Sequence, residues 1–322
     1  MTKNLFKYVK KFLPLIGIII LVLLVISLDV EKIKNAFLSI KPIYIVLALS
    51  LTFPMVLIRN YGWQLLLKEQ KIKIGYFLSL KIFLIGFFYC SITPGYIGHV
   101  VRIPYLKEET GEPYGKLFVN TVIDSVLRAI SQYLMILTGA ILVIGTFPEL
   151  FWVNIIIFVI FVLMLFYLFK KERGEKLFHI FIKYLIPRKL RDNFYRFVNT
   201  FYFDFPRVTR LVFPFLLSLI TCIIVFTQVY IIVIALGVNI PYHIFILLFP
   251  LANVVGFIPI TLAGIGTREL TSVLIFSTLF TVTKEEVLVF TLVGFILTDI
   301  FTGFIGFLVS LTEAREKEFI PT

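Results

Sequence analysis

A glycine-bearing turn in the first half of the sequence carries residue types that could bind an anion. It runs through Pro94, Gly95 and Gly98 and leads directly to His99 and Arg102. A turn followed by a helix presents free backbone N–H groups and the positive end of a helix dipole, which favour a phosphate or a carboxylate. An arginine at the same place can bind such a group with two parallel hydrogen bonds. These five residues are therefore predicted to contribute to an anion-binding site.

A second turn of the same kind occurs late in the sequence. It contains Gly264 and Gly266 and is followed by Arg268 and Glu269, which we predict to be part of the same site. The alternative is that the glycines serve backbone geometry alone, and that Arg102 and Arg268 extend toward lipid headgroups.

Four further charged residues lie in otherwise apolar sequence and are predicted to face the protein interior, because each costs about 2.5–3.5 kcal/mol at the centre of a membrane helix. Asp124 and Arg128 are four residues apart and can neutralise each other on one helix, although a substrate or proton role is equally compatible with them. Arg59 and Asp299 have no local partner. They are candidates for substrate binding unless a partner lies on another helix.

No pattern in the sequence indicates a metal, a cofactor or a catalytic triad. The two cysteines, Cys90 and Cys222, both lie in apolar sequence, and no zinc-type spacing is present. A phosphate-binding Walker loop and a dinucleotide-binding fingerprint are also missing from the sequence. We therefore predict no cofactor, no metal site and no catalytic residues.

The elements that must position these residues are membrane helices. Of the 322 residues, 59% are hydrophobic and 16% are charged, and the mean hydropathy of +0.99 leaves too little polar surface for a soluble globule. Crossing a bilayer takes roughly 20 apolar residues. We predict an all-α polytopic bundle, a single integral membrane domain over residues 1–322, with six spans at 12–28, 42–67, 117–147, 150–169, 211–236 and 287–311.

The positive charge is concentrated between two predicted spans. Residues 170–210 contain eleven lysines and arginines against four acidic residues, and so carry seven of the twelve net positive charges of the chain. Basic loops beside spans remain cytoplasmic and attract anionic headgroups. We predict a multi-pass protein of the cell membrane with both termini in the cytoplasm. Segment 170–210 is expected to lie on the cytoplasmic membrane surface, and we expect no binding to nucleic acid.

Two copies of one unit are predicted from the spacing of these elements. The glycine-bearing turns align with an offset of 168 residues, and the same offset superimposes the spans that flank them. The six spans can alternate in direction with both termini in the cytoplasm only if segments 76–116 and 240–286 each return to the membrane face from which they start. We therefore predict a first repeat over 42–147 and an inverted second repeat over 211–315, each with a re-entrant helix pair.

At its two turns the chain resembles the lysylphosphatidylglycerol synthase transmembrane-region family, and the resemblance covers nearly the whole chain. The chain differs from the usual pattern of that family at Tyr96, His99 and Leu262. The resemblance implies lipid translocation, or a membrane domain that supports lipid modification. It does not imply aminoacyl transfer, because only about ten residues follow the last predicted span, and no soluble transferase domain is expected. The similar motifs are Pro94-Gly95-Tyr96-Ile97-Gly98-His99-Val100-Val101-Arg102 and Pro259-Ile260-Thr261-Leu262-Ala263-Gly264-Ile265-Gly266-Thr267-Arg268-Glu269.

Three functions are compatible with the sequence. The first is translocation of an anionic phospholipid or a polyprenyl-phosphate-linked lipid, whose headgroup would bind between the two turns. The second is a membrane-embedded lipid transferase in which His99 or Glu269 acts as the general base. The third is a non-catalytic membrane partner of a separate glycosyltransferase or lipid synthase. We expect membrane lipids to be partners in all three cases.

Overall fold

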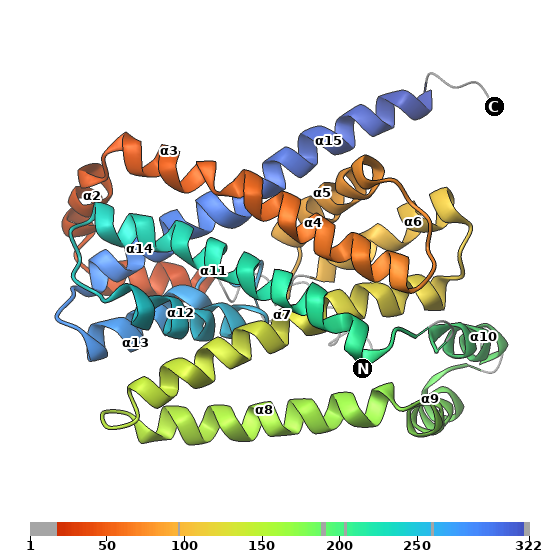
Figure 1. Cartoon of the computed structure of the whole chain (residues 1–322). Helices are drawn as coiled ribbons and strands as arrows, with labels where there is room; N and C mark the ends of the chain where they lie inside the picture. Colours follow the sequence, from red (N-terminus) through yellow and green to blue (C-terminus); the bar gives the residue numbers. More distant parts are fainter. Residues whose placement is uncertain (1–17, 96, 188–190, 203–204, 259–260, 319–322) are drawn as a thin grey trace, which may run out of the picture.

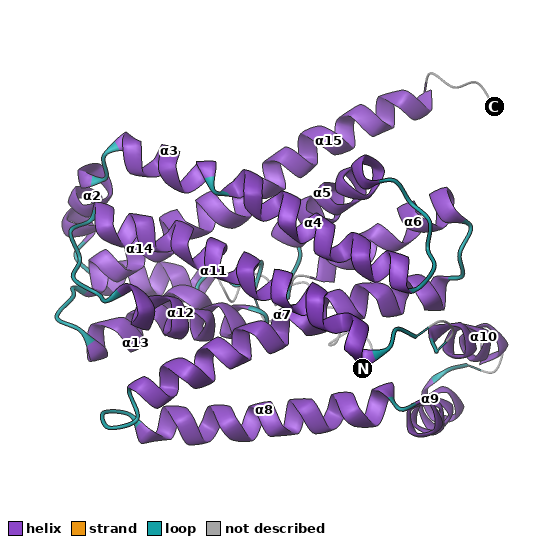
Figure 2. Cartoon of the chain, viewed as in Figure 1, coloured by secondary structure: helices purple, strands orange, loops and turns teal. Residues whose placement is uncertain are grey.

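The regular elements of the protein are helices (Figures 1 and 2). The computed structural model describes residues 18–318 apart from 96, 188–190, 203–204 and 259–260, and no β-strand occurs in this part of the chain. The predicted all-α class is confirmed. The first residues of the predicted span 12–28 lie outside the described residues, as do Tyr96 and Pro259 of the two motifs. The described part of that span forms the helix Ile18–Ser27.

Within the described residues, five helical stretches are long and apolar enough to cross a membrane. Their bounds lie within a few residues of five predicted spans. The largest difference is at 117–147, where the helix begins earlier, directly after Pro113, and ends at Leu142. The five stretches are Pro42–Glu69 (α3 Pro42–Ser50 and α4 Thr52–Glu69), α7 Tyr114–Leu142, α8 Pro148–Phe169, Val208–Ala235 (η3 Val208–Leu211 and α11 Val212–Ala235), and Lys284–Thr312 within α14 Lys284–Phe295, η4 Ile296–Ile300 and α15 Phe301–Glu318.

The last long stretch contains one turn of π-helix, η4, between α14 and α15. Two threonine hydroxyls donate to main-chain carbonyls here: Thr298 to Gly294, before the π-turn, at 2.9 Å, and Thr302 to Thr298, within the π-turn, at 2.7 Å. Single π-turns inside long helices are often found at functional sites. This turn contains Asp299, one of the predicted site residues.

Two regions contain helices too short to cross a bilayer. In the first, α5 (Tyr76–Ser91) is followed by the 3₁₀ helix η1 (Ile97–Val101) and by α6 (Arg102–Thr110). In the second, α12 (Tyr242–Gly256) is followed by α13 (Thr267–Leu279). The longest of these, α5, has 16 residues and is therefore about 24 Å long. A glycine-bearing turn separates the short helices in both regions.

Helices from the first half of the chain pack against helices from the second half. Helix α4 packs against α11, α5 packs against α15, and α12 packs against α7. A cluster of aromatic rings fills the core between α12, α13 and α14, where the ring centroids of Phe245, Phe249, Phe276 and Phe290 lie 5.0–6.5 Å apart.

The remaining helices lie at the two ends of the bundle. Segment 170–210 contains α9 (Lys171–Leu185) and α10 (Arg191–Phe201), which pack together beside the ends of α7 and α8 (Figure 1). At the other end, α2 (Val30–Ser39) is capped by the Asp29 carboxylate, which accepts hydrogen bonds from two main-chain N–H groups of its first turn.

Candidate functional site

The first turn is held against the end of α5 by one threonine. The Thr93 hydroxyl donates to the Tyr89 carbonyl at 2.8 Å and accepts from the Gly98 N–H at 2.9 Å. Gly98 lies so close to α5 that a Cβ atom would be 2.2 Å from the Tyr89 carbonyl carbon. Glycine is therefore required here, and it brings His99 into the protein interior, where its side chain is buried.

The second turn is closed by Glu269. Gly264 has a φ of +78° and packs on the backbone of Gly256, so both its conformation and its surroundings favour glycine. The buried Glu269 carboxylate accepts from the Gly266 N–H at 2.5 Å at the start of α13. An internal carboxylate therefore occupies this helix N-terminus.

The two turns meet in the interior. An isolated antiparallel bridge joins the backbones of Pro94 and Leu262. Pro94 and Gly95 belong to the first turn and Gly264 to the second, so the structure brings together the two segments that were predicted to form one site. Their glycines shape the backbone at this contact.

Arg102 is fully buried behind the first turn rather than exposed at a binding surface. Its guanidinium lies over the rings of Trp63 and Phe83, 4.9 and 4.4 Å from their centroids. Its Nη1 atom is 3.3 Å from a carboxylate oxygen of Asp124. Gly86 leaves the space that the arginine side chain fills. This geometry assigns Arg102 to a buried ion pair.

Asp124 is shared between two arginines. The same carboxylate oxygen that faces Arg102 lies 3.5 Å from Nη2 of Arg128, one helical turn further along α7. The predicted pairing of Asp124 with Arg128 is therefore present, and Arg128 also donates to the Ser125 hydroxyl at 3.3 Å. Arg128 reaches the cavity described below, whereas Asp124 lies behind it.

Arg268 connects the second turn to the π-turn. It lies 3.3 Å from the carboxylate of Glu269 and 3.7 Å from that of Asp299, and its guanidinium covers the ring of Phe295 at 4.2 Å. The Thr298 hydroxyl lies 2.8 Å from an Asp299 carboxylate oxygen and shares its one proton between this oxygen and the Gly294 carbonyl. Asp299 thus has a partner on another helix, as the alternative expectation allowed.

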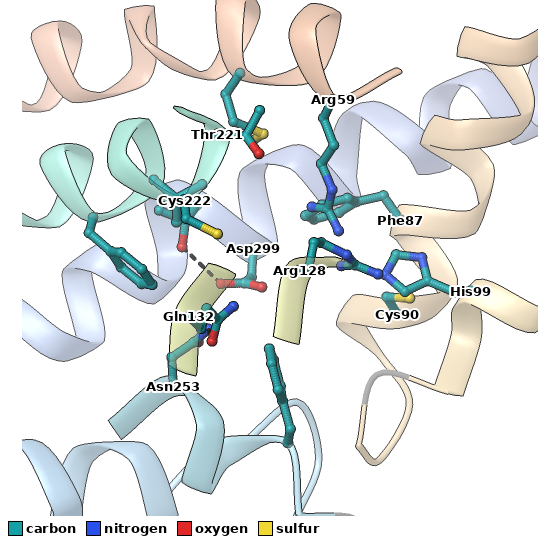
Figure 3. A pocket seen from close by; sticks show the side chains of 15 residues that line it. Arg59, Phe87, Cys90, His99, Arg128, Gln132, Thr221, Cys222, Asn253 and Asp299 are labelled. Carbon is teal, nitrogen blue, oxygen red and sulfur yellow. Dashed lines mark hydrogen bonds between the residues drawn. The ribbon is translucent and has the colours of Figure 1, made fainter. Parts of the chain in front are cut away.

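A polar cavity lies between the halves, with a volume of about 70 Å³, room for a few water molecules. Four predicted site residues line it: Arg59, His99, Arg128 and Asp299 (Figure 3). The other predicted residues, which do not line it, are Pro94, Gly95, Gly98, Arg102, Asp124, Gly264, Gly266, Arg268 and Glu269.

Arg59 differs from the other arginines of the site because it makes no ion pair with any described residue. It projects from α4 into the cavity (Figure 3). Its guanidinium lies 5.4 and 5.3 Å from the ring centroids of Phe83 and Phe87, and its buried Nε atom has no hydrogen-bond partner in the described structure. The cavity therefore contains a positive charge that forms no ion pair with a described carboxylate.

The cavity also contains polar residues that the sequence analysis did not identify. Asn253 of α12 donates to Gln132 of α7 at 3.2 Å and so connects the two halves, while Thr221 of α11 lines the wall nearby. Asn253 and Gln132 could have been found from the sequence, because each is an uncharged amide within an apolar helix. Cys90 and Cys222 also line the cavity, and neither forms a disulfide bond. Among the described residues, no group of three or more His, Cys, Asp or Glu side chains could hold a metal ion.

An apolar groove of about 410 Å³ adjoins the polar cavity and shares His99, Arg128 and Phe257 with it. Its walls come mainly from η1 and α7, and Gly95 and Phe161 of α8 also line it. A polar cavity and an apolar groove thus have common walls, which is the arrangement that a molecule with a polar head and a hydrocarbon chain requires.

These features define a multi-pass helical membrane protein with a charged internal cavity. A family model described as the lysylphosphatidylglycerol synthase TM region matches residues 14–306, and the chain belongs to this family. It is also similar to a UPF0104 membrane protein of Methanothermobacter thermautotrophicus, with 22% identity over 285 residues that cover 82% of this chain and 83% of the relative.

Proposed function

We propose that this protein is a lipid translocator that binds the anionic headgroup of a phospholipid or a polyprenyl-phosphate-linked lipid in the polar cavity. The observation that carries the proposal is Arg59, a cation in the cavity without a described counter-ion. Among the described residues around the turns and the cavity there are four arginines and three carboxylates: Arg59, Arg102, Arg128 and Arg268, and Asp124, Glu269 and Asp299. A bound phosphate would remove the excess positive charge in a setting where unpaired charge is costly.

The adjoining apolar groove supports a lipid rather than a free anion as substrate. In the proposal, Arg59 and Arg128 hold the headgroup, and the hydrocarbon chain follows the groove past Phe257 and Phe161. Arg102 and Arg268 then act indirectly, since each holds in place a carboxylate at or behind the cavity wall. Membrane lipids would reach the groove directly from the bilayer.

An inverted repeat would provide the movement, and the packing of the helices supports it. With the offset of 168 residues, α5 corresponds to α12 and α7 corresponds to the stretch from α14 to α15. The contact of α5 with α15 then has its equivalent in the contact of α12 with α7. Such exchanged pairs are expected when two copies are related by a two-fold axis in the membrane plane, around which the halves can rock.

The test is headgroup movement in liposomes that contain the purified full-length protein and a fluorescent anionic phospholipid. Arg59→Gln removes the unpaired charge and is expected to slow translocation about tenfold or more, because hydrogen bonds to charged groups contribute about 1.5–3 kcal/mol. Arg59→Lys should retain part of the activity. Arg196→Gln, which makes the same change at an exposed position of α10, is the matched control.

Three results would contradict the proposal. If Arg59→Gln translocated lipid as fast as the wild-type protein, the headgroup would not bind at Arg59. A new lipid species without headgroup movement would favour a transferase, and substitution of His99 or Glu269 would then be tested for loss of product. No movement and no product, with a separate glycosyltransferase or lipid synthase that co-purifies, would favour a non-catalytic partner.

A further inference from the structure

A second and larger groove lies away from the cavity, between α7, α8 and the start of α11. Its volume is about 680 Å³, and apolar side chains such as Ile130, Val162 and Phe215 form its walls. Lys170 and Arg207 line it at the end where α8 stops and η3 begins. The groove therefore has apolar walls and two cations at one end.

Both cations are available to a ligand. Lys170 and Arg207 are exposed, and neither forms an ion pair with a described residue. Lys170 is the first residue of the basic segment and directly precedes α9, and Arg207 lies near the end of the segment and directly precedes η3. The neighbouring arginine Arg210 differs from them, since it pairs with Glu69 at 2.8 Å.

The outer wall of the groove is a helix that the bundle hardly covers. Asn154 is the one buried residue of α8, and Val162 and Phe166 remain exposed although they line the groove. Apolar side chains in such a position are covered by hydrocarbon in a membrane. The two cations make an anionic lipid a better match than a neutral one.

We propose that this groove is a binding site for one anionic phospholipid, with an acyl chain along α8 and the phosphate between Lys170 and Arg207. The site is separate from the polar cavity. It depends on the membrane location of the chain and on the groove, and it does not depend on the assignment of Arg59. The proposed lipid site in this groove and the proposed headgroup site in the polar cavity can therefore be tested independently, because the failure of one does not contradict the other.

The experiment is native mass spectrometry of the full-length protein in detergent, titrated with phosphatidylglycerol or phosphatidylcholine. Lys170→Ala with Arg207→Ala is expected to weaken phosphatidylglycerol binding by about 30-fold, the effect of two cations near an anionic group. Lys176→Ala with Arg196→Ala is the control, because it removes the same charge from exposed positions of the same segment that do not line the groove.

A second pair of variants tests the apolar part. Val162→Trp should fill the groove and reduce the amount of bound phosphatidylglycerol, whereas Val153→Trp, at an exposed position of α8 outside the groove, should not. Equal losses in the two charge variants would mean general attraction to the basic segment and would overturn the proposal. The proposal would also fail if phosphatidylcholine bound as tightly as phosphatidylglycerol, or if Val162→Trp bound normally.

Discussion

Asp124 holds two arginines in place at the centre of the protein. One of them, Arg102, is fully buried against Trp63 and Phe83, and the carboxylate is its ion-pair partner among the described residues. A buried ion pair contributes little compared with an apolar replacement, but removal of one partner leaves a charge that cannot be solvated. The pair therefore restricts which substitutions the site accepts.

Asp124→Asn is expected to lower the free energy of unfolding by about 3–5 kcal/mol, because Arg102 loses its counter-charge in a place closed to water. Thermal unfolding of the detergent-solubilised protein measures the effect. Asp192→Asn, an exposed acid-to-amide change on α10, is the control. Equal melting temperatures for the two variants would contradict a stabilising role for this ion pair.

At this scale the sequence predicted which residues are charged and interior, but not all of their partners. Asp124 and Arg128 could be paired from sequence because they are one helical turn apart. The contact of Arg102 with Asp124 and that of Arg268 with Asp299 depend on tertiary packing, which a local pattern does not contain. Arg59 differs from the other three arginines because it has no ion pair with a described residue. This difference also depends on tertiary packing, so the sequence does not contain it.

The first turn shows how a single glycine allows two elements to pack closely. Gly98 brings η1 into backbone contact with α5. Gly98→Ala is expected to destabilise the protein by about 1–3 kcal/mol, because an inserted Cβ must displace backbone. Gly145→Ala is the control, since a Cβ there would meet no atom within 4 Å. The melting temperatures of the two variants measure the effect. An unchanged melting temperature for Gly98→Ala would contradict the close contact.

The contact between α8 and the basic segment gives a prediction about pH. The Tyr202 hydroxyl donates to the Leu168 carbonyl at 2.7 Å. Burial, and secondly the charge of Glu175, raises the pKa of Tyr202 from 10.0 to about 12. The folded state therefore holds the phenol proton more tightly than the unfolded state does. The protonated Tyr202 hydroxyl stabilises the folded state fully below about pH 10, and this contribution is lost as the pH rises toward 12.

Hydrogen exchange of α9 and α10 would measure this effect. In the wild-type protein, the exchange rate of the α9 and α10 amides should rise between pH 10 and pH 12. The rise should be larger than the increase of the intrinsic exchange rate over the same pH range. Tyr202→Phe lacks the hydroxyl and should show weaker protection at pH 9, by about 1 kcal/mol, without the additional rise at high pH. The same additional rise in both proteins would mean that another group titrates there.

Helix positions were largely predictable because a membrane imposes a minimum length on apolar runs. Five predicted spans correspond to long helices, with ends that differ by a few residues. The π-turn at 296–300 was not predicted, since threonines in an apolar run have no unique helical geometry. The glycine-bearing turns were predicted as breaks, but their contact through Pro94 and Leu262 required the folded structure.

At the scale of the whole molecule, the proposed inverted repeat makes a prediction that single helices do not. Equivalent parts of the two copies must start from opposite faces of the membrane. Lys107 on α6 belongs to the first copy, and Lys284 at the start of α14 belongs to the second. We expect Lys107 on the cytoplasmic side and Lys284 on the outer side.

Cysteines introduced at these two positions, with Cys90 and Cys222 replaced by alanine, can be tested in intact cells with a membrane-impermeant maleimide. Lys284→Cys should react from outside, like Thr146→Cys in the loop between α7 and α8. Lys107→Cys should react only after the membrane is opened, like Lys176→Cys in the basic segment, because its helix returns to the cytoplasmic face. If both positions react from the same side, the halves cannot be inverted copies, and rocking about a central two-fold axis is no longer available as the mechanism of translocation.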